Sequence, residues 1–175
     1  MDGARLTDPG AAIARLPTGS AVILRDYDAP DRRARAANLA RLCQGRRLRL
    51  LVAGDARLAL AADAHGLHLP EGLACGGDRR WRLWRKPGWL VTAAAHSPGA
   101  VAQARRAGVH AVLLSPVFAT ASHPGAITLG ALRFAAWTRK AGLPVYALGG
   151  MTAATTRRLS GSGAAGVAAI SGFAR

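Results

Sequence analysis

Short apolar runs alternate with helical patterns along almost the whole chain. Most of these runs lack the alternating polar residues of a half-exposed strand, which is typical of parallel strands buried on both faces. We expect eight strands, at Ala4–Thr7, Ala21–Leu24, Arg49–Ala53, Gly66–Leu69, Trp89–Ala93, Ala111–Phe118, Pro144–Leu148 and Gly166–Ser171. Strands of this kind, separated by helices, build a parallel sheet with the helices outside it.

Helix start and stop signals lie between the apolar runs. Asp31 can cap one helix, and Ser97, followed by a proline, is a typical start of another. The segment Leu129–Ala141 has a helical pattern that ends at Gly142, where a glycine can adopt the left-handed conformation of a helix end. Thr152 can cap a last helix. These signals fill most of the gaps between the predicted strands.

The alternation of strands and helices predicts one domain over residues 1–175. The expected fold is a compact (β/α)8 TIM barrel with abbreviated first and last helices. A typical barrel of this class has about 250 residues, but here Pro9–Thr18 leaves little room for a first helix, and the chain stops four residues after Ser171. An open doubly wound sheet is the alternative. It gains no support, because no strand is followed by the G-x-G-x-x-G of a dinucleotide-binding turn.

The composition suits a globular protein. Half of the residues are hydrophobic and 19% are charged, which excludes an intrinsically disordered chain. No apolar run reaches the roughly eighteen residues of a membrane-spanning helix, and no apolar core of signal-peptide length follows the first residues. The expected location is the cytoplasm, with no membrane partner. Two cysteines, Cys43 and Cys75, provide neither a zinc cluster nor a disulfide framework.

The net charge of +15 has two interpretations. All basic residues except Lys86 and Lys140 are arginines, and many stand in pairs scattered along expected helix surfaces. They can bind nucleic acid, or they can reflect a compositional bias that also attracts small anions. No zinc-finger, basic-zipper or aromatic RNA-binding signature accompanies them. We therefore favour small anionic ligands and expect no nucleic acid as a partner.

Polar residues follow several strands at the edge where barrel enzymes gather their active sites. Arg25 follows the second expected strand, Asp55 the third and Glu71 the fourth. His96 follows the fifth strand and His123 lies in the loop after the sixth, so both are candidates to transfer protons. Glu71 is the only glutamate of the chain, so a mechanism that needs many carboxylates is disfavoured.

Glycines mark the loops after the last two expected strands. Gly149 and Gly150 follow one strand, and Ile170 and Ser171 end the next. Backbone N–H groups in such loops can approach an anion closely, and phosphate sites of these barrels commonly form there. A tight strand-to-helix turn is the alternative reason for the glycine pair. We expect a phosphate site formed by these four residues.

The order of several short motifs resembles the thiamine phosphate synthase superfamily, which includes the TenI-type thiazole tautomerases. The resemblance runs from Leu6 to Ser171. Its most specific pieces are Leu67-His68-Leu69-Pro70, Ser115-Pro116-Val117-Phe118-Ala119-Thr120, Leu129-Gly130, Ala147-Leu148-Gly149-Gly150-Met151 and Gly166-Val167-Ala168-Ala169-Ile170-Ser171. The resemblance implies the barrel fold and an enzyme that couples hydroxymethylpyrimidine diphosphate to thiazole phosphate with release of diphosphate.

The resemblance also implies roles for individual residues. Arg25 keeps the arginine of the family's Gln-Leu-Arg-x-Lys, but Tyr27 replaces its lysine. Asp55 matches one magnesium ligand, whereas the second is missing and Glu71 is the only acid nearby. Magnesium is therefore expected to bind only together with substrate. His123 replaces a lysine of the family's Thr-x-Thr-Lys.

Arg25 and His123 are thus the expected catalytic residues. The expected substrate-binding residues are Thr120, Ser122, Gly149, Gly150, Ile170 and Ser171. A thiazole tautomerase is the alternative, because the Leu69-Pro70 pair resembles that branch, although Pro116 replaces the histidine of its signature. A non-catalytic phosphate-binding barrel is a further alternative. The sequence leaves open whether the chain forms a homodimer.

Overall fold

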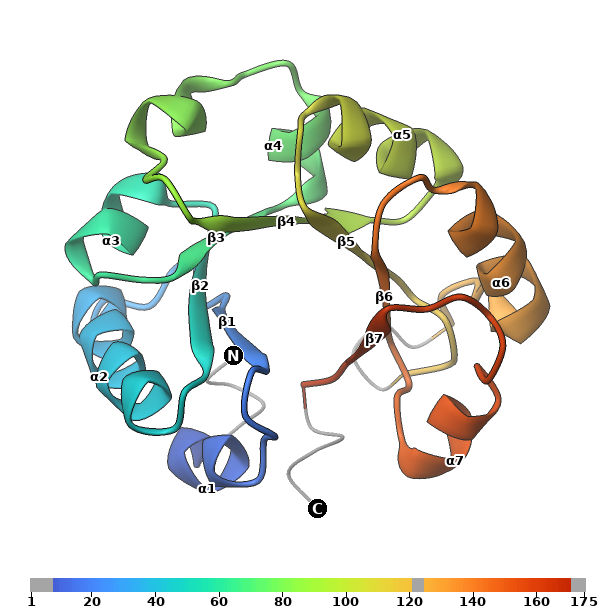
Figure 1. The fold of residues 1–175 in the computed structure, drawn as a ribbon, viewed down its shortest axis with the longest axis horizontal. Helices are drawn as coiled ribbons and strands as arrows, with labels where there is room; N and C mark the ends of the chain where they lie inside the picture. The colour runs from blue at the N-terminus through green and yellow to red at the C-terminus, as the bar shows by residue number, and fades with distance from the viewer. Residues whose placement is uncertain (1–7, 121–124, 171–175) are drawn as a thin grey trace.

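The computed structural model describes residues 8–120 and 125–170. Within them, seven parallel strands form one curled sheet in the order β1 to β7, with helices around its outside (Figure 1). The strands are β1 (Ala21–Leu24), β2 (Arg49–Ala53), β3 (Gly66–Leu69), β4 (Leu90–Ala95), β5 (Ala111–Leu114), β6 (Val145–Leu148) and β7 (Gly166–Ala168). The predicted TIM-barrel class is confirmed, and the expected strand Ala4–Thr7 lies outside the described residues.

The helices occupy the gaps between the strands. They are α1 (Pro9–Ala14), α2 (Arg32–Gly45), α3 (Ala56–Ala61), α4 (Glu71–Cys75), the 3-10 helix η1 (Arg80–Trp84), α5 (Pro98–Arg106), α6 (Gly130–Lys140) and α7 (Ala153–Arg157). The first helix has only six residues, so its predicted abbreviation is confirmed. Ser97 and Thr152 cap α5 and α7 with their side chains, as predicted.

Asp31 departs from its prediction as a helix cap. It stands at the cap position of α2, but its side chain makes no bond to the helix backbone. Its carboxylate instead accepts a hydrogen bond of 2.7 Å from Nε of Arg35, one turn along the helix. The charged partner therefore takes the oxygen that would have served the backbone N–H groups.

Three strand ends also differ from their predictions, and β4 is the one that runs further, to Ala95 in place of Ala93. The apolar run that begins at Ala111 stops being a strand after Leu114, because Pro116 has no N–H to donate to a ladder. The N–H of Val117 reaches the carbonyl of Leu148 instead, at 2.9 Å. β7 ends at Ala168, three residues before Ser171, and Ser171 lies outside the part of the chain that the structure describes.

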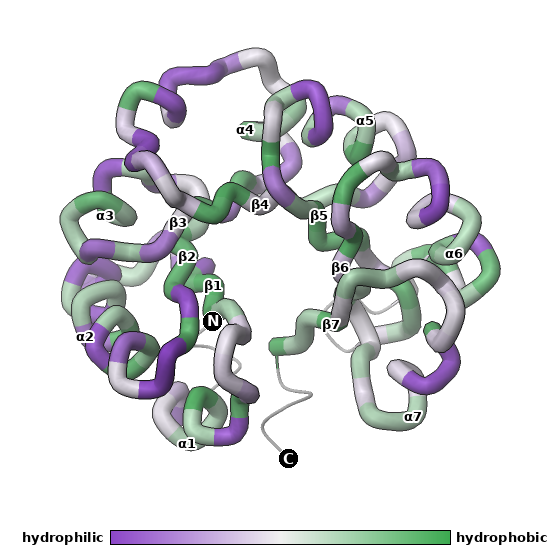
Figure 2. Tube along the Cα trace, viewed as in Figure 1, coloured by the Kyte–Doolittle hydropathy of each residue, from purple (hydrophilic) through white to green (hydrophobic). Residues whose placement is uncertain are grey.

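The two faces of the sheet have different surroundings. The outward face packs under the helices, and its residues are fully buried, as at Leu50, Leu67 and Val91. Figure 2 shows the resulting pattern, with apolar strands inside a ring of helices that carry polar residues. The inward face holds the alternate residues, and these surround the barrel interior. None of the described helices is long and apolar enough to cross a membrane.

Candidate functional site

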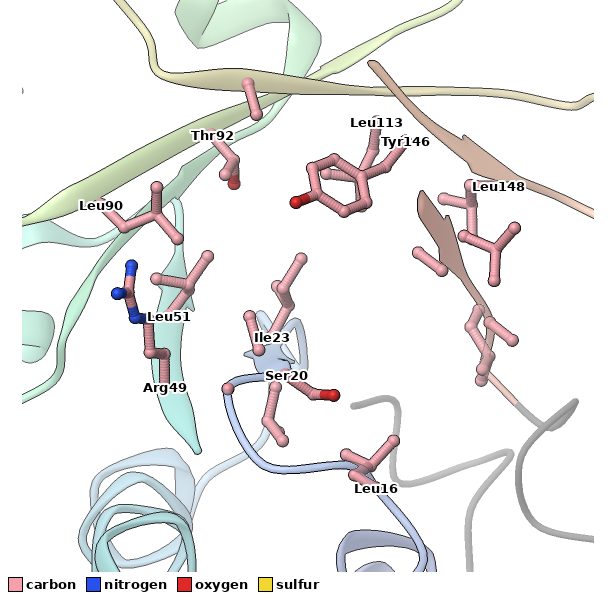
Figure 3. A pocket seen from close by; sticks show the side chains of 18 of the residues that line it. Leu16, Ser20, Ile23, Arg49, Leu51, Leu90, Thr92, Leu113, Tyr146 and Leu148 are labelled. Carbon is pink, nitrogen blue, oxygen red and sulfur yellow. The ribbon is translucent and has the colours of Figure 1, made fainter. Parts of the chain in front are cut away.

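A cavity of about 560 Å³ fills the interior of the curled sheet. Residues of six strands line it, and most are apolar (Figure 3). The hydroxyls of Thr92 and Tyr146 point into its open centre. Arg25 and Ile170, both predicted site residues, lie in its wall. The structure thus brings a predicted catalytic residue and a predicted substrate-binding residue to one space.

Arg25 is the cation at the carboxyl end of this cavity. It follows Leu24, which pairs in register with Val52 of β2, and is half-buried. No hydrogen bond or ion pair joins Arg25 to another residue in the ranges 8–120 and 125–170. A half-buried arginine without a carboxylate partner is suited to an anionic ligand.

The imidazole of His68 is a buried polar group that feels the charge of Arg25. His68 of β3 stands in register between Ala53 of β2 and Thr92 of β4. Burial, and then the positive charge of Arg25, lower the pKa of His68 from 6.5 to about 4. The neutral ring shares a hydrogen bond of 2.9 Å between its Nδ1 and the hydroxyl of Thr92. His68 is therefore a neutral structural group whose ring feels the charge of Arg25.

Asp55, the predicted magnesium ligand, stands at the carboxyl end of β2. One carboxylate oxygen accepts a hydrogen bond of 2.9 Å from the N–H of Leu58 and so caps α3. The other lies 3.8 Å from a terminal nitrogen of Arg32. Both oxygens of this carboxylate therefore already face donors of the protein.

Glu71, the other acid considered for magnesium, binds His96. One oxygen of Glu71 lies 2.7 Å from the backbone N and 2.6 Å from Nδ1 of His96. Within residues 8–120 and 125–170, no group of three or more His, Cys, Asp and Glu side chains could hold a metal ion. The described side chains therefore offer no cluster of protein ligands for a resident magnesium ion, and an ion at one carboxylate would depend on waters or substrate phosphates.

The sequence alone did not predict the contact between Glu71 and His96. The two residues are 25 positions apart, and the strands that precede them, β3 and β4, pair with each other. Neighbouring parallel strands end beside each other, so the pair could have been predicted if the order of the strands had been known. The result is an imidazole held by a carboxylate on one side of its ring.

The glycine pair after β6 packs against the loop after β5. Gly149 has a φ of +96°, and a side chain there would lie 2.9 Å from Cα of Pro116. Gly150 has a φ of +66°, and its Cβ would lie 2.4 Å from the carbonyl oxygen of Ala119. Loop packing therefore requires both glycines whether or not an anion binds. Their phosphate role stays a prediction.

The remaining predicted residues lie close to the ends of the described ranges. Thr120 directly follows the loop that packs on Gly150 and is half-buried. Ser122, His123 and Ser171 lie outside the described residues. Of the predicted catalytic and substrate-binding residues, the structure therefore describes Arg25, Thr120, Gly149, Gly150 and Ile170.

The chain is similar to proteins of known family over most of its length. The sequence pattern of the thiamine monophosphate synthase family matches residues 10–173. A thiamine-phosphate synthase of Thiobacillus denitrificans is 34% identical over 155 residues, which cover 87% of this chain and 72% of that protein. One of Geobacillus kaustophilus is 31% identical over 146 residues, covering 82% of this chain and 65% of the relative.

A solved structure shows the same fold. The thiamine phosphate pyrophosphorylase of Pyrococcus furiosus superposes with a TM-score of 0.73 at 22% identity. The match covers 92% of this chain and 76% of the other. At this identity the comparison bears on the fold.

Proposed function

Since this chain belongs to the thiamine monophosphate synthase family, we propose that it couples hydroxymethylpyrimidine diphosphate to a thiazole phosphate and releases diphosphate. It is then a transferase, and its location is the cytoplasm. The observation that carries this proposal is Arg25, a cation without an acidic partner among the described residues, at the carboxyl end of a mostly apolar cavity. The volume of about 560 Å³ lies within the range of small-molecule sites.

The proposed reaction separates charge, and the cavity suits that need. The bond between the pyrimidine methylene carbon and the diphosphate oxygen breaks, and both electrons leave with the diphosphate. The thiazole nitrogen then donates its lone pair to the cationic carbon. Arg25 stabilises the charge on the departing diphosphate, because a fixed cation in a poorly solvated site acts without reorganisation. Apolar walls such as Leu51 and Leu113 exclude water, which would otherwise capture the cation.

The thiazole phosphate is proposed to bind at the loops after β6 and β7. Gly149 and Gly150 follow Leu148, which pairs in register with Ala168, two residues before Ile170. Ser171, Thr120 and Ser122 are proposed to add hydroxyls, and His123 a titratable cation near the diphosphate. These assignments rest on the motif positions of the family.

A charge-matched pair of variants tests this proposal. Arg25 and Arg49 line the same cavity, but Arg49 begins β2 and so lies at the opposite end of the sheet. Arg25→Gln should lower the formation of thiamine phosphate, followed by mass spectrometry, about a hundredfold or more. Arg49→Gln should leave the rate near that of the wild type. Equal losses in both variants would contradict a specific role for Arg25.

One observation favours an isomerase as the second candidate. A thiazole isomerase removes a proton from one carbon of thiazole carboxylate phosphate and returns it at another. His96, held at Nδ1 by Glu71, leaves its Nε2 without a partner among the described residues, which is the arrangement of an oriented acid/base. In heavy water, the isomerase would incorporate deuterium into the thiazole without any pyrimidine diphosphate, and His96→Asn would stop it. Binding of thiazole phosphate with neither reaction would indicate a non-catalytic member.

A further inference from the structure

Arg32, the first residue of α2, reaches the carboxyl end of β2. One terminal nitrogen donates to the carbonyl of Ala53, and the other lies 3.8 Å from the carboxylate of Asp55. Its guanidinium also lies over the ring of Tyr27, 5.5 Å from the ring centre. Only 14% of its side chain is exposed. These contacts hold the guanidinium in one place at the mouth of the barrel.

The guanidinium of Arg32 keeps donors that the protein does not use. Its Nε is buried and has no hydrogen-bond partner within the described ranges. The terminal nitrogen that faces Asp55, at 3.8 Å, makes no hydrogen bond within the described ranges either, so a ligand oxygen can accept from it. Ala53, which Arg32 contacts, follows Val52, the register partner of Leu24. Arg32 therefore lies beside the strand end from which Arg25 extends.

Other acids do not neutralise these two arginines. Asp26 lies 3.0 Å from Arg35, so its charge has a cation of its own. Asp55 is the one carboxylate in an ion pair with Arg32 among the described residues. A magnesium ion placed at Asp55 would meet the positive charge of Arg32 at close range, which disfavours its binding.

We infer that Arg32 takes the position of a divalent cation at Asp55, and that Arg25 and Arg32 together bind a diphosphate group without a metal ion. Two guanidinium groups supply the same charge as one magnesium ion. Each can present paired N–H donors to phosphate oxygens. The choice of a diphosphate as ligand rests on the proposed function. The replacement of the metal by an arginine rests on the contacts of Arg32 alone.

Binding of inorganic pyrophosphate, measured by calorimetry in the presence of EDTA, tests this inference. The wild type should bind with EDTA present, and Arg32→Gln should weaken the affinity about tenfold or more, as expected for the loss of a charged hydrogen-bond donor. Arg33→Gln is the matched control, since Arg33 is the next residue of the same helix and is exposed. It should bind as the wild type does.

The variant Asp55→Asn distinguishes most clearly between pyrophosphate binding without a metal and binding that needs magnesium at Asp55. Asparagine caps a helix about as well as aspartate, so α3 should persist while the carboxylate is lost. Pyrophosphate affinity should stay equal or increase, because Arg32 then has no acidic competitor. Binding that disappears in EDTA, returns with magnesium and is lost in Asp55→Asn would overturn the inference. If Arg32→Gln does not fold by circular dichroism, the wild type and Asp55→Asn decide the question.

The outcome is separable from that of the proposed function, because pyrophosphate binding requires no turnover. Pyrophosphate binding through Arg32 in EDTA, without formation of thiamine phosphate, would refute the coupling reaction and leave this inference intact. Magnesium-dependent coupling that fails in Asp55→Asn would support the coupling reaction and refute this inference.

Discussion

Two parts of the carboxyl edge of the sheet are built in different ways. After β5 and β6, backbone packs on backbone, with Gly149 against Pro116 and Gly150 against Ala119. After β1 to β4, side chains pair with each other, as Arg32 does with Asp55 and Glu71 with His96. Substitution in the first part should disturb the fold, whereas substitution in the second can change the chemistry and leave the fold in place.

The largest effect is expected from a side chain at Gly150. Gly150→Ala should lower the free energy of unfolding by about 2–4 kcal/mol, because a left-handed backbone and a clash with the carbonyl of Ala119 combine. Gly161 is the matched control, with a φ of +72° and no neighbour within 4 Å of an added Cβ. Gly161→Ala should cost only about 1 kcal/mol. Equal costs in urea denaturation would show that the loop contact does not matter.

In the part of the sheet edge after β1 to β4, the stability of the protein should depend on pH through His68. The pKa of His68 is lowered from 6.5 to about 4 in the folded protein, so the unfolded chain takes up this proton first as the pH falls. The stability is fully present above about pH 6.5 and is lost between pH 6.5 and 4. Each pH unit corresponds to about 1.4 kcal/mol, so the loss amounts to roughly 3 kcal/mol at most.

Denaturant titrations of the wild type and of His68→Asn across this pH range would measure the effect. The variant has no imidazole at this position, so its stability should depend less steeply on pH. Parallel curves for the two proteins would assign the pH dependence to other groups.

The smallest expected effect on stability is at Asp55, where two variants separate its role as a helix cap from the effect of its charge. Asp55→Ala should lower the stability by about 1 kcal/mol, because α3 loses the bond to the N–H of Leu58. Asp55→Asn should cost only a few tenths of a kcal/mol. Thermal unfolding of the two variants provides the comparison, and a large loss in Asp55→Asn would show that the ion pair with Arg32 stabilises the fold substantially.

Much of the fold could be predicted because local signals agree with the tertiary structure. Three strands, such as Gly66–Leu69, have the predicted bounds, since a continuous apolar run suits a strand buried on both faces. Ser97 and Thr152 cap helices because their short side chains bond to the nearby backbone. Asp31 stands at the predicted cap position but makes no bond to the helix backbone, because a cation one turn away competes for its carboxylate.

The candidate site was less predictable. Arg25 stands at a strand end, so its place at the cavity follows from the sequence pattern. Arg32 begins a helix rich in arginines, so in the sequence it looks like any solvated arginine. Only the fold shows that it donates to the carbonyl of Ala53. Contacts between distant segments, such as Glu71 and His96, depend on which strands are neighbours, and no local pattern contains that information.

The packed loops after β5 and β6 have a consequence for the kinetics of ligand capture. The N–H groups of Val117 and Phe118 donate to the carbonyls of Leu148 and Gly149, so this backbone is ordered before any ligand arrives. A ligand that binds to these residues does not bear the entropic cost of immobilising them. Capture at these loops should therefore be limited by diffusion and desolvation, and differences in affinity among ligands should appear mainly as differences in residence time.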